Sequence, residues 1–220
     1  MAKLRLLFVK EAQASYISHL DLMRTFQRVF PRGGLELKHS QGFHPHPLLS
    51  IVLPLPVGQS SECELLDFEV EQDADGTGVA ELLNAGLPAG LRVRGCYPAV
   101  RPARELAFLR ARVEFDYDSG VPAGAAEKLG ELFARGEVLV SKRTKHKDLA
   151  QINVAPLIRS LSWTAEGNRA AADVVVAAQN PGLNPGLLEA AAAAYLPELK
   201  PDFARVRRLE LYDAAGNVFR

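Results

Sequence analysis

The side chains best suited to chemistry are concentrated in one short stretch, HSQGFHPHP at residues 39–47, called the histidine segment below. It holds three of the chain's five histidines, His39, His44 and His46. A fourth, His19, lies upstream in the tetrapeptide SHLD. Because imidazole titrates near neutral pH, it can act as an acid, a base, a metal ligand or a contact for phosphate. The segment therefore predicts a functional site whose chemistry is one of these.

A metal site is the interpretation with the least support. His44 and His46 are separated by one residue, and on an extended segment such side chains point to opposite faces. The sequence contains none of the local zinc or metalloprotease motifs, and Cys63 and Cys96 match no metal-ligand spacing. We therefore expect neither a metal ion nor another cofactor.

General acid–base catalysis is a second interpretation. His19 and His44 would be the acid and base of phosphodiester or nucleotide chemistry, and the carboxylate of Asp21 would orient an imidazole. This requires the three side chains to lie within hydrogen-bond reach in one pocket. A serine nucleophile is not expected, because the sequence has no G-x-S-x-G motif and Ser18 is explained as a helix cap.

Contact with RNA or a nucleotide is the third interpretation, and it is the one that we prefer. Phosphate binding needs only cationic and hydrogen-bonding side chains. Two segments of the chain supply them, the first at 24–46 and the second at 142–147. The candidate residues are Arg24, Arg28, His39, Ser40 and His46, with Lys142, Arg143, Lys145 and Lys147 in the second segment. No aromatic RNP motif occurs, so stacking of bases on a sheet in the usual manner is not expected.

The chain has 220 residues and a formal net charge of zero, but its charges are unevenly spread. Residues 1–60 carry seven Lys/Arg against three acids, 61–90 carry eight acids and no base, and 91–112 hold six arginines and one acid. The stretch SKRTKHK at 141–147 is also basic. These basic stretches either converge on one face or form separate solvated surfaces, and the sequence leaves both arrangements open.

A helix is expected to carry the upstream candidates. Ser18 is placed to cap a helix over 18–30, with the Asp21 carboxylate near the positive end of the helix dipole. One face of this helix is apolar, and the opposite stripe carries arginines. The apolar face consists of Leu20, Leu22, Met23, Phe26, Val29 and Phe30.

The histidine segment is expected to be a stiff, extended loop. Pro45 and Pro47 restrict the backbone before them to extended conformations, and Gly42 can adopt a positive φ. Such a loop presents side chains at fixed angles, as a site requires. The alternative is a corner between two strands in which Phe43 fills the core.

The secondary-structure elements follow a similar order in both halves of the chain. Strand patterns at 3–10 and 108–118 each precede a helix, further strands, a second helix and a last strand. This βαββαβ order predicts an α+β protein of two tandem ferredoxin-like units. The first unit is expected over 1–100 and the second over 106–220.

Several motifs resemble a known family. They are SHLD at 18–21, SQGFHPHP at 40–47, LPLPVG at 53–58 with the acidic strand after it, and the basic stretch KRTKHKDLAQINVAPLI at 142–158. Together they are similar to the bacterial radical-SAM-linked domain of unknown function, which stands alone or follows a radical S-adenosylmethionine protein.

The resemblance implies that the chain is a companion of radical-SAM enzymes with a link to RNA. The sequence has no Cys-x-x-x-Cys-x-x-Cys motif, so this chain does not hold the radical-SAM cluster through it. A further alternative is a protein-interaction module that docks a radical-SAM partner, which predicts an exposed apolar patch.

The sequence shows no sign of a membrane segment. No apolar run approaches the roughly 18 residues needed to span a bilayer, and the N-terminus does not have the pattern of a signal peptide. The chain has two cysteines, far apart. We therefore expect a soluble cytoplasmic protein that contacts no membrane.

Overall fold

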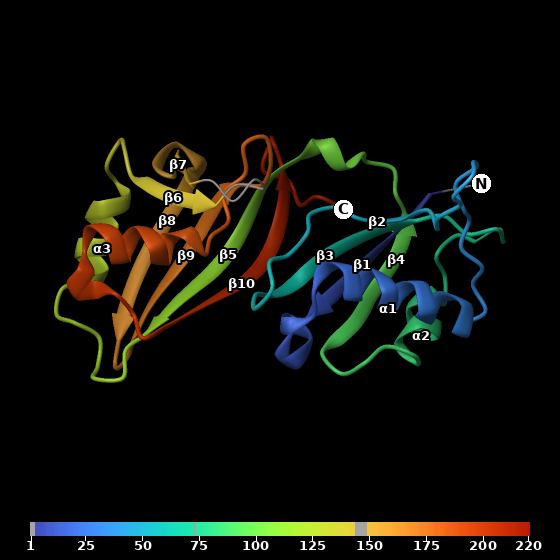
Figure 1. Ribbon diagram of the computed structural model, residues 1–220, viewed down its shortest axis with the longest axis horizontal. Coiled ribbons are helices and arrows are strands. Elements are labelled where there is room, and N and C mark those ends of the chain that lie inside the picture. The colour runs from blue at the N-terminus through green and yellow to red at the C-terminus, as the bar shows by residue number, and fades with distance from the viewer. Residues whose placement is uncertain (1–2, 73, 144–148) are drawn as a thin grey trace. The chain divides into compact units, whose positions relative to one another are not determined.

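The computed structural model describes residues 3–72, 74–143 and 149–220, with the backbone alone at 142, 143 and 149 (Figure 1). The chain forms two compact units. Unit 1 comprises Met1–Glu105 with Val218–Arg220, and unit 2 comprises Leu106–Asn217. The last three residues thus belong to unit 1, whereas the division expected from the sequence assigns them to the second half.

Unit 1 has the βαββαβ order of a ferredoxin-like fold. Its elements are β1 (Leu4–Lys10), a 3-10 turn (Ala12–Tyr16), α1 (His19–Arg32), β2 (Leu49–Ile51), β3 (Ser60–Phe68), α2 (Val79–Asn84), β4 (Leu91–Pro98) and a 3-10 turn (Ala103–Glu105). The strands lie in the order β4-β1-β3-β2, and all three pairings are antiparallel. The predicted α+β class is confirmed. The stretch at 35–39, whose sequence LELKH alternates apolar and polar residues, contributes only isolated bridges.

Unit 2 repeats this order with one insertion. Its elements are β5 (Leu106–Asp116), α3 (Ala125–Phe133), β6 (Leu139–Arg143), β7 (Leu149–Asn153), a 3-10 turn (Ala155–Leu157), β8 (Ile158–Glu166), β9 (Arg169–Ala177), α4 (Leu187–Tyr195), a 3-10 turn (Pro197–Leu199) and β10 (Phe203–Asp213). The order β10-β5-β9-β8 is again ferredoxin-like and antiparallel. Within the part of the chain that the structure describes, the inserted β6 and β7 pair with each other and with no other strand.

Helix α1 begins as its sequence predicts. The Asp21 N–H donates to Ser18 Oγ (3.2 Å), and the Ser18 hydroxyl donates to Asp21 Oδ2 (2.8 Å). This reciprocal cap satisfies one of the free N–H groups of the first turn. The helix continues to Arg32 and so includes Pro31 in its last turn. Leu20, expected on the apolar face, is instead 65% exposed.

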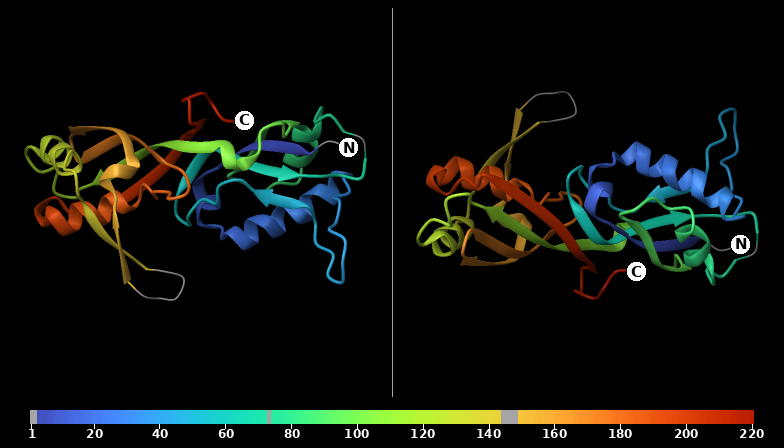
Figure 2. Two further views of the ribbon diagram at one scale, coloured as in Figure 1. Left: turned by 90° about the horizontal axis from the view of Figure 1, so that it is seen from above. Right: turned by 90° about the horizontal axis from the view of Figure 1, so that it is seen from below.

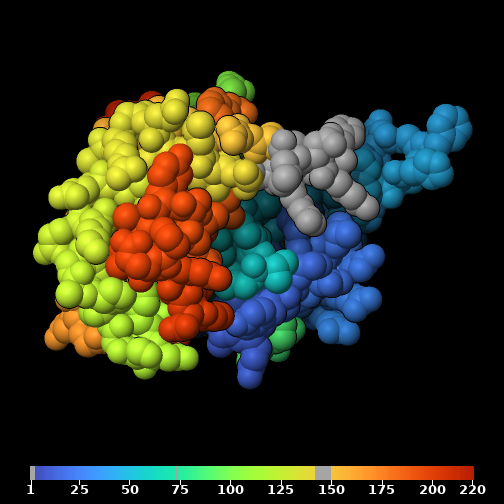
Figure 3. Space-filling model, turned by 60° about the vertical axis from the view of Figure 1, so that its left-hand side comes forward, coloured from blue at the N-terminus to red at the C-terminus, as the bar shows by residue number. Residues whose placement is uncertain are grey.

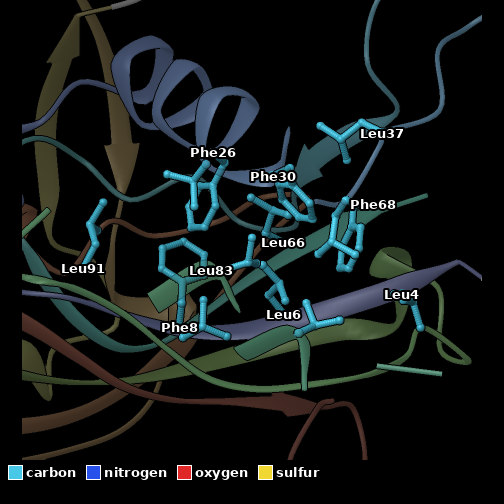
Figure 4. Close-up of a cluster of buried hydrophobic side chains, with 14 of the residues drawn as sticks. Leu4, Leu6, Phe8, Phe26, Phe30, Leu37, Leu66, Phe68, Leu83 and Leu91 are labelled. Atoms are coloured by element: carbon cyan, nitrogen blue, oxygen red, sulfur yellow. The ribbon is translucent and has the colours of Figure 1, made fainter. Parts of the chain in front are cut away.

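The core of unit 1 lies between the helices and one face of the sheet (Figure 4). Leu4, Leu6 and Phe8 of β1 point into it, because alternate residues of a strand share a face. Phe8 packs edge-on against Phe26 of α1, with ring centroids 5.0 Å apart. Burying these apolar side chains fixes α1 on the sheet, and with it the polar stripe on the outer side of the helix.

In unit 2 the chain's one tryptophan, Trp163, contributes to the packing. Its ring lies 5.0 Å from that of Phe115 and 6.3 Å from that of Phe133. These contacts join β8 to β5 and α3. Within the described residues, no helix has the length and apolar character that crossing a membrane requires.

Candidate functional site

The histidine segment forms a hairpin that is closed at its base by a small polar network. His39 and Pro47 form an isolated antiparallel bridge, and the Ser40 N–H donates to the His46 carbonyl (2.9 Å). The Ser40 Oγ lies 2.7 Å from His46 Nδ1 and accepts a hydrogen bond from the His46 N–H (3.1 Å). These bonds fix the two strands of the hairpin on each other, as the predicted stiffness requires.

The tip of the hairpin is fully open to solvent. Gly42 has a φ of +132°, a backbone conformation that residues other than glycine rarely adopt. Phe43 is 101% exposed, and His44 is also exposed. The alternative in which Phe43 fills the core is therefore wrong. In both views of Figure 2 the segment, light blue, projects from the C-terminal end of α1, and in Figure 3 the light-blue atoms extend outward from the surface.

His19 and Asp21 lie at the opposite end of α1 from this hairpin. Both are in the first turn of the helix and are exposed, and Asp21 is engaged by Ser18 and by Arg24 (3.2 Å). The hydrogen bond from Ser18, and next that from Arg24, lower the pKa of the Asp21 carboxyl. A helix of 14 residues is about 20 Å long. The structure therefore does not bring His19 and Asp21 together with His44.

The arginine stripe of α1 is only partly neutralised. Arg24 pairs with Asp21 at 3.2 Å, in an exposed i,i+3 ion pair of little energetic weight. Arg28 and Arg32 instead line a hollow of about 330 Å³, called the Arg28–Arg32 hollow below. Arg28 was among the expected phosphate contacts, but its place beside a hollow could not be predicted, because the opposite wall comes from residues 85–88.

A second, smaller hollow lies at the base of the histidine segment. Its volume is about 240 Å³, and it is lined by Lys3, 46–50 and 67–69. Its charge is mixed, because its lining includes the cationic Lys3 and the carboxylates of Asp67 and Glu69. Asp67 is in turn bound by Lys3 and by the buried Arg5. Sequence reasoning missed this hollow, although the acidic strand that supplies one wall was apparent.

The second basic segment is placed only in part. Lys142 and Arg143 belong to β6, and the structure describes their backbone alone. Lys145 and Lys147 lie outside the described residues. Within the described residues, no group of three or more His, Cys, Asp and Glu side chains is arranged to hold a metal ion.

Three exposed apolar side chains lie on neighbouring segments near the start of α1, and are called the apolar patch below. Tyr16 is 68%, Leu20 65% and Val57 58% exposed. The loop that carries Val57 is tied to the first 3-10 turn, because the Gly58 N–H donates to the Ser15 carbonyl (2.9 Å). Exposed apolar side chains on one part of a surface are typical of protein contacts.

Comparison with solved structures supports the α+β fold. Over 94% of this chain and 48% of the other, it is similar to a chain in the crystal structure of a Cbf5-Nop10-Gar1 complex, with 11% identity and a TM-score of 0.53. The chain thus spans about half the length of that relative. An unknown protein from Galdieria sulphuraria aligns over 97% of this chain and 98% of its own, with 11% identity and a TM-score of 0.27.

Comparison by sequence gives the family. No curated protein matches the chain. Residues 3–185 match DUF2344, a family described as an uncharacterized protein conserved in bacteria. This match includes the strands and helices of unit 1, the histidine segment and most of unit 2. The chain therefore belongs to the DUF2344 family of bacterial proteins.

Proposed function

We propose that unit 1 binds RNA through the histidine segment. The observation that carries this proposal is the hairpin tip, where Phe43 and His44 are exposed on a backbone fixed by the Ser40–His46 pair. An aromatic ring without protein neighbours gains nothing for folding, so its place on a stiffened hairpin indicates a contact with another molecule.

Single-stranded RNA fits the chemistry of this tip. Unstacked bases pack on aromatic rings whatever their sequence, and each such contact contributes about 1–3 kcal/mol. The flanking imidazoles of His39, His44 and His46 can donate hydrogen bonds to phosphate and sugar oxygens. The exposed guanidinium groups of α1, whose C-terminal end adjoins the hairpin, add positive charge.

The test is the affinity of labelled single-stranded RNA and of tRNA, measured by fluorescence anisotropy at two salt concentrations. The variant Phe43→Ala/His44→Ala should bind at least about fivefold more weakly, from the loss of one stacked base. Phe203→Ala is the matched control, because Phe203 is also an exposed phenylalanine but lies in β10 of unit 2. Equal affinities of wild type and hairpin variant, or no RNA binding at low salt, would contradict the proposal.

The catalytic alternative loses its geometric support. An acid and a base that act on one bond must both reach the reacting atoms, whereas His19 and His44 lie at opposite ends of α1. We therefore do not propose phosphodiester or nucleotide chemistry at these two residues.

We propose as a second function that the chain is a companion of a radical-SAM protein. The resemblance of its motifs supports this, and the apolar patch is the observation that favours it. A Leu20→Glu/Val57→Glu variant should then lose binding to a purified bacterial radical-SAM protein that the wild type binds, while Leu82→Glu, also at an exposed leucine, should keep it. Binding that survives the change at the patch would count against this function.

A further inference from the structure

The Arg28–Arg32 hollow has two walls from separate parts of unit 1. It is lined by Thr25, Arg28, Val29 and Arg32 of α1 and by Ala85, Gly86, Leu87 and Pro88 after α2. Its volume of about 330 Å³ is at the lower end of the range of small-molecule sites, roughly 300–1,000 Å³. The hollow is therefore large enough to hold a small ligand, and not only ordered water.

The charge of the hollow is uniformly positive. None of its lining residues is acidic, and Arg28 and Arg32 have no carboxylate partner among the residues that the structure describes. Being four residues apart on a helix, the two guanidinium groups lie on the same side. Arg24, one turn earlier, is paired with Asp21 and does not line the hollow. The polar stripe of α1 thus contains one arginine whose charge is neutralised by an ion pair and two whose guanidinium groups can bind an anion.

The other wall supplies space. Gly86 has no side chain to fill the hollow, and a Cβ there would meet Val29 Cγ1 at 3.5 Å. An anion in the hollow could therefore approach both walls and accept hydrogen bonds from both guanidinium groups.

We propose that the Arg28–Arg32 hollow binds a terminal phosphate monoester, that of an RNA end or of a nucleotide. Such a group carries about −1.5 to −2 charges at pH 7, which two guanidinium groups neutralise, whereas an internal phosphodiester carries only about −1. Arginine also matches the oxygen geometry of phosphate with paired hydrogen bonds.

The hollow and the proposed RNA contact both lie toward the C-terminal end of α1. Arg32 is the last residue of α1, and the histidine segment projects from the same end of that helix. This end is the negative pole of the helix dipole, so the guanidinium groups and not the helix must attract the anion. The identity of the ligand rests on the proposed function, because the phosphate is assigned to RNA that is held at the hairpin.

The experiment compares three labelled RNAs of one sequence, with a 5′-phosphate, with a 3′-phosphate, and with hydroxyl groups at both ends. AMP and inorganic phosphate are tested as competitors, and directly by NMR titration of the protein. Arg28→Gln/Arg32→Gln removes the two charges. Arg92→Gln/Arg94→Gln in β4 is the matched control, since it removes two exposed arginines from a strand that does not line the hollow. Gly86→Leu fills the hollow and leaves both charges in place.

The wild type should bind one of the phosphorylated RNAs roughly tenfold more tightly than the hydroxyl form, a difference of about 1.4 kcal/mol. Arg28→Gln/Arg32→Gln and Gly86→Leu should each abolish that preference, and Arg92→Gln/Arg94→Gln should retain it. Equal affinity of the wild type for all three RNAs, or a preference that survives in the Arg28/Arg32 variant, would overturn the proposal. Circular dichroism spectra confirm that each variant is folded.

The two proposals fail in distinguishable ways. If Phe43→Ala weakens RNA binding but no terminal phosphate is preferred, the hollow is not a phosphate site and the hairpin contact stands. If AMP or inorganic phosphate perturbs Arg28 and Arg32 while RNA does not bind, the hollow is a phosphate site for a free nucleotide and the RNA proposal falls.

Discussion

A buried ion pair on the sheet face opposite the core of unit 1 allows a quantitative prediction. Arg5 of β1 is completely buried, and Asp67 of β3 is 3% exposed. Arg5 Nε and Nη2 donate to the two Asp67 oxygens at 2.6 and 3.0 Å, and Lys3 Nζ lies 3.0 Å from Oδ2. The Arg5 guanidinium also donates to the Arg101 carbonyl (2.9 Å) and lies 5.0 Å from the centre of the Phe219 ring.

Replacing Asp67 by alanine leaves the Arg5 charge buried, with the Arg101 carbonyl and the Phe219 ring as its remaining contacts among the described residues. Breaking a buried pair in this way costs about 3–5 kcal/mol, a large part of the roughly 5–15 kcal/mol that stabilises a typical domain. Replacing both partners by apolar side chains of similar size, as in Arg5→Met/Asp67→Leu, should be neutral or stabilising, because no charge then remains without a partner.

The assay must report on unit 1. Trp163 is the only tryptophan and lies in unit 2, so its fluorescence does not suffice. Hydrogen exchange of the amides in β1 and β3, followed by mass spectrometry, measures the opening free energy where the pair lies. A loss below about 1 kcal/mol in Asp67→Ala, or equal destabilisation of Asp67→Ala and the double variant, would refute the reasoning.

Three further outcomes follow from burial. Phe26→Ala should destabilise unit 1 by about 3–5 kcal/mol in urea unfolding, whereas Phe43→Ala should change stability by less than about 0.5 kcal/mol, since only Phe26 lies in the core. Burial raises the pKa of Tyr97 to about 12, so stability present below the unfolded tyrosine pKa of about 10 should be lost as the pH rises to 12, and less so in Tyr97→Phe. Burial likewise raises the pKa of the Cys96 thiol to about 12, so iodoacetamide should label it far more slowly at pH 8 than an unfolded control.

The order of elements could be predicted because each has a local signature. Alternation of apolar residues gives β1, and the SHLD cap gives the start of α1. The β6–β7 hairpin could not be predicted in the same way, since β6 has a strand pattern but nothing in it specifies its partner. Pairing between strands is non-local, so a local pattern does not say which segment lies beside it.

Prediction from local sequence patterns is limited in the same way for single residues of the candidate site. The proline and glycine positions predicted a stiff, extended loop; the Ser40–His46 contact agrees with the stiffness, but the hairpin that it closes was not predicted. They did not predict the exposure of Phe43, because phenylalanine is usually buried. Nor could periodicity show that Arg5, on the outward face of β1, is buried under Phe219 from near the other end of the chain. Such placements depend on tertiary contacts that no local pattern contains.

The two proposed contacts in unit 1 differ in their dependence on salt. Stacking on Phe43 releases no counterions, so Phe43→Ala should lower RNA affinity by the same factor at every salt concentration. A phosphate held by Arg28 and Arg32 does release them, at a slope of about 0.7 in log affinity against log salt for each single-strand phosphate. The arginine variant should therefore flatten the plot by about that amount, while the Phe43 variant shifts it in parallel. Parallel shifts in both would mean that Arg28 and Arg32 make no phosphate contact, because loss of such a contact must change the slope.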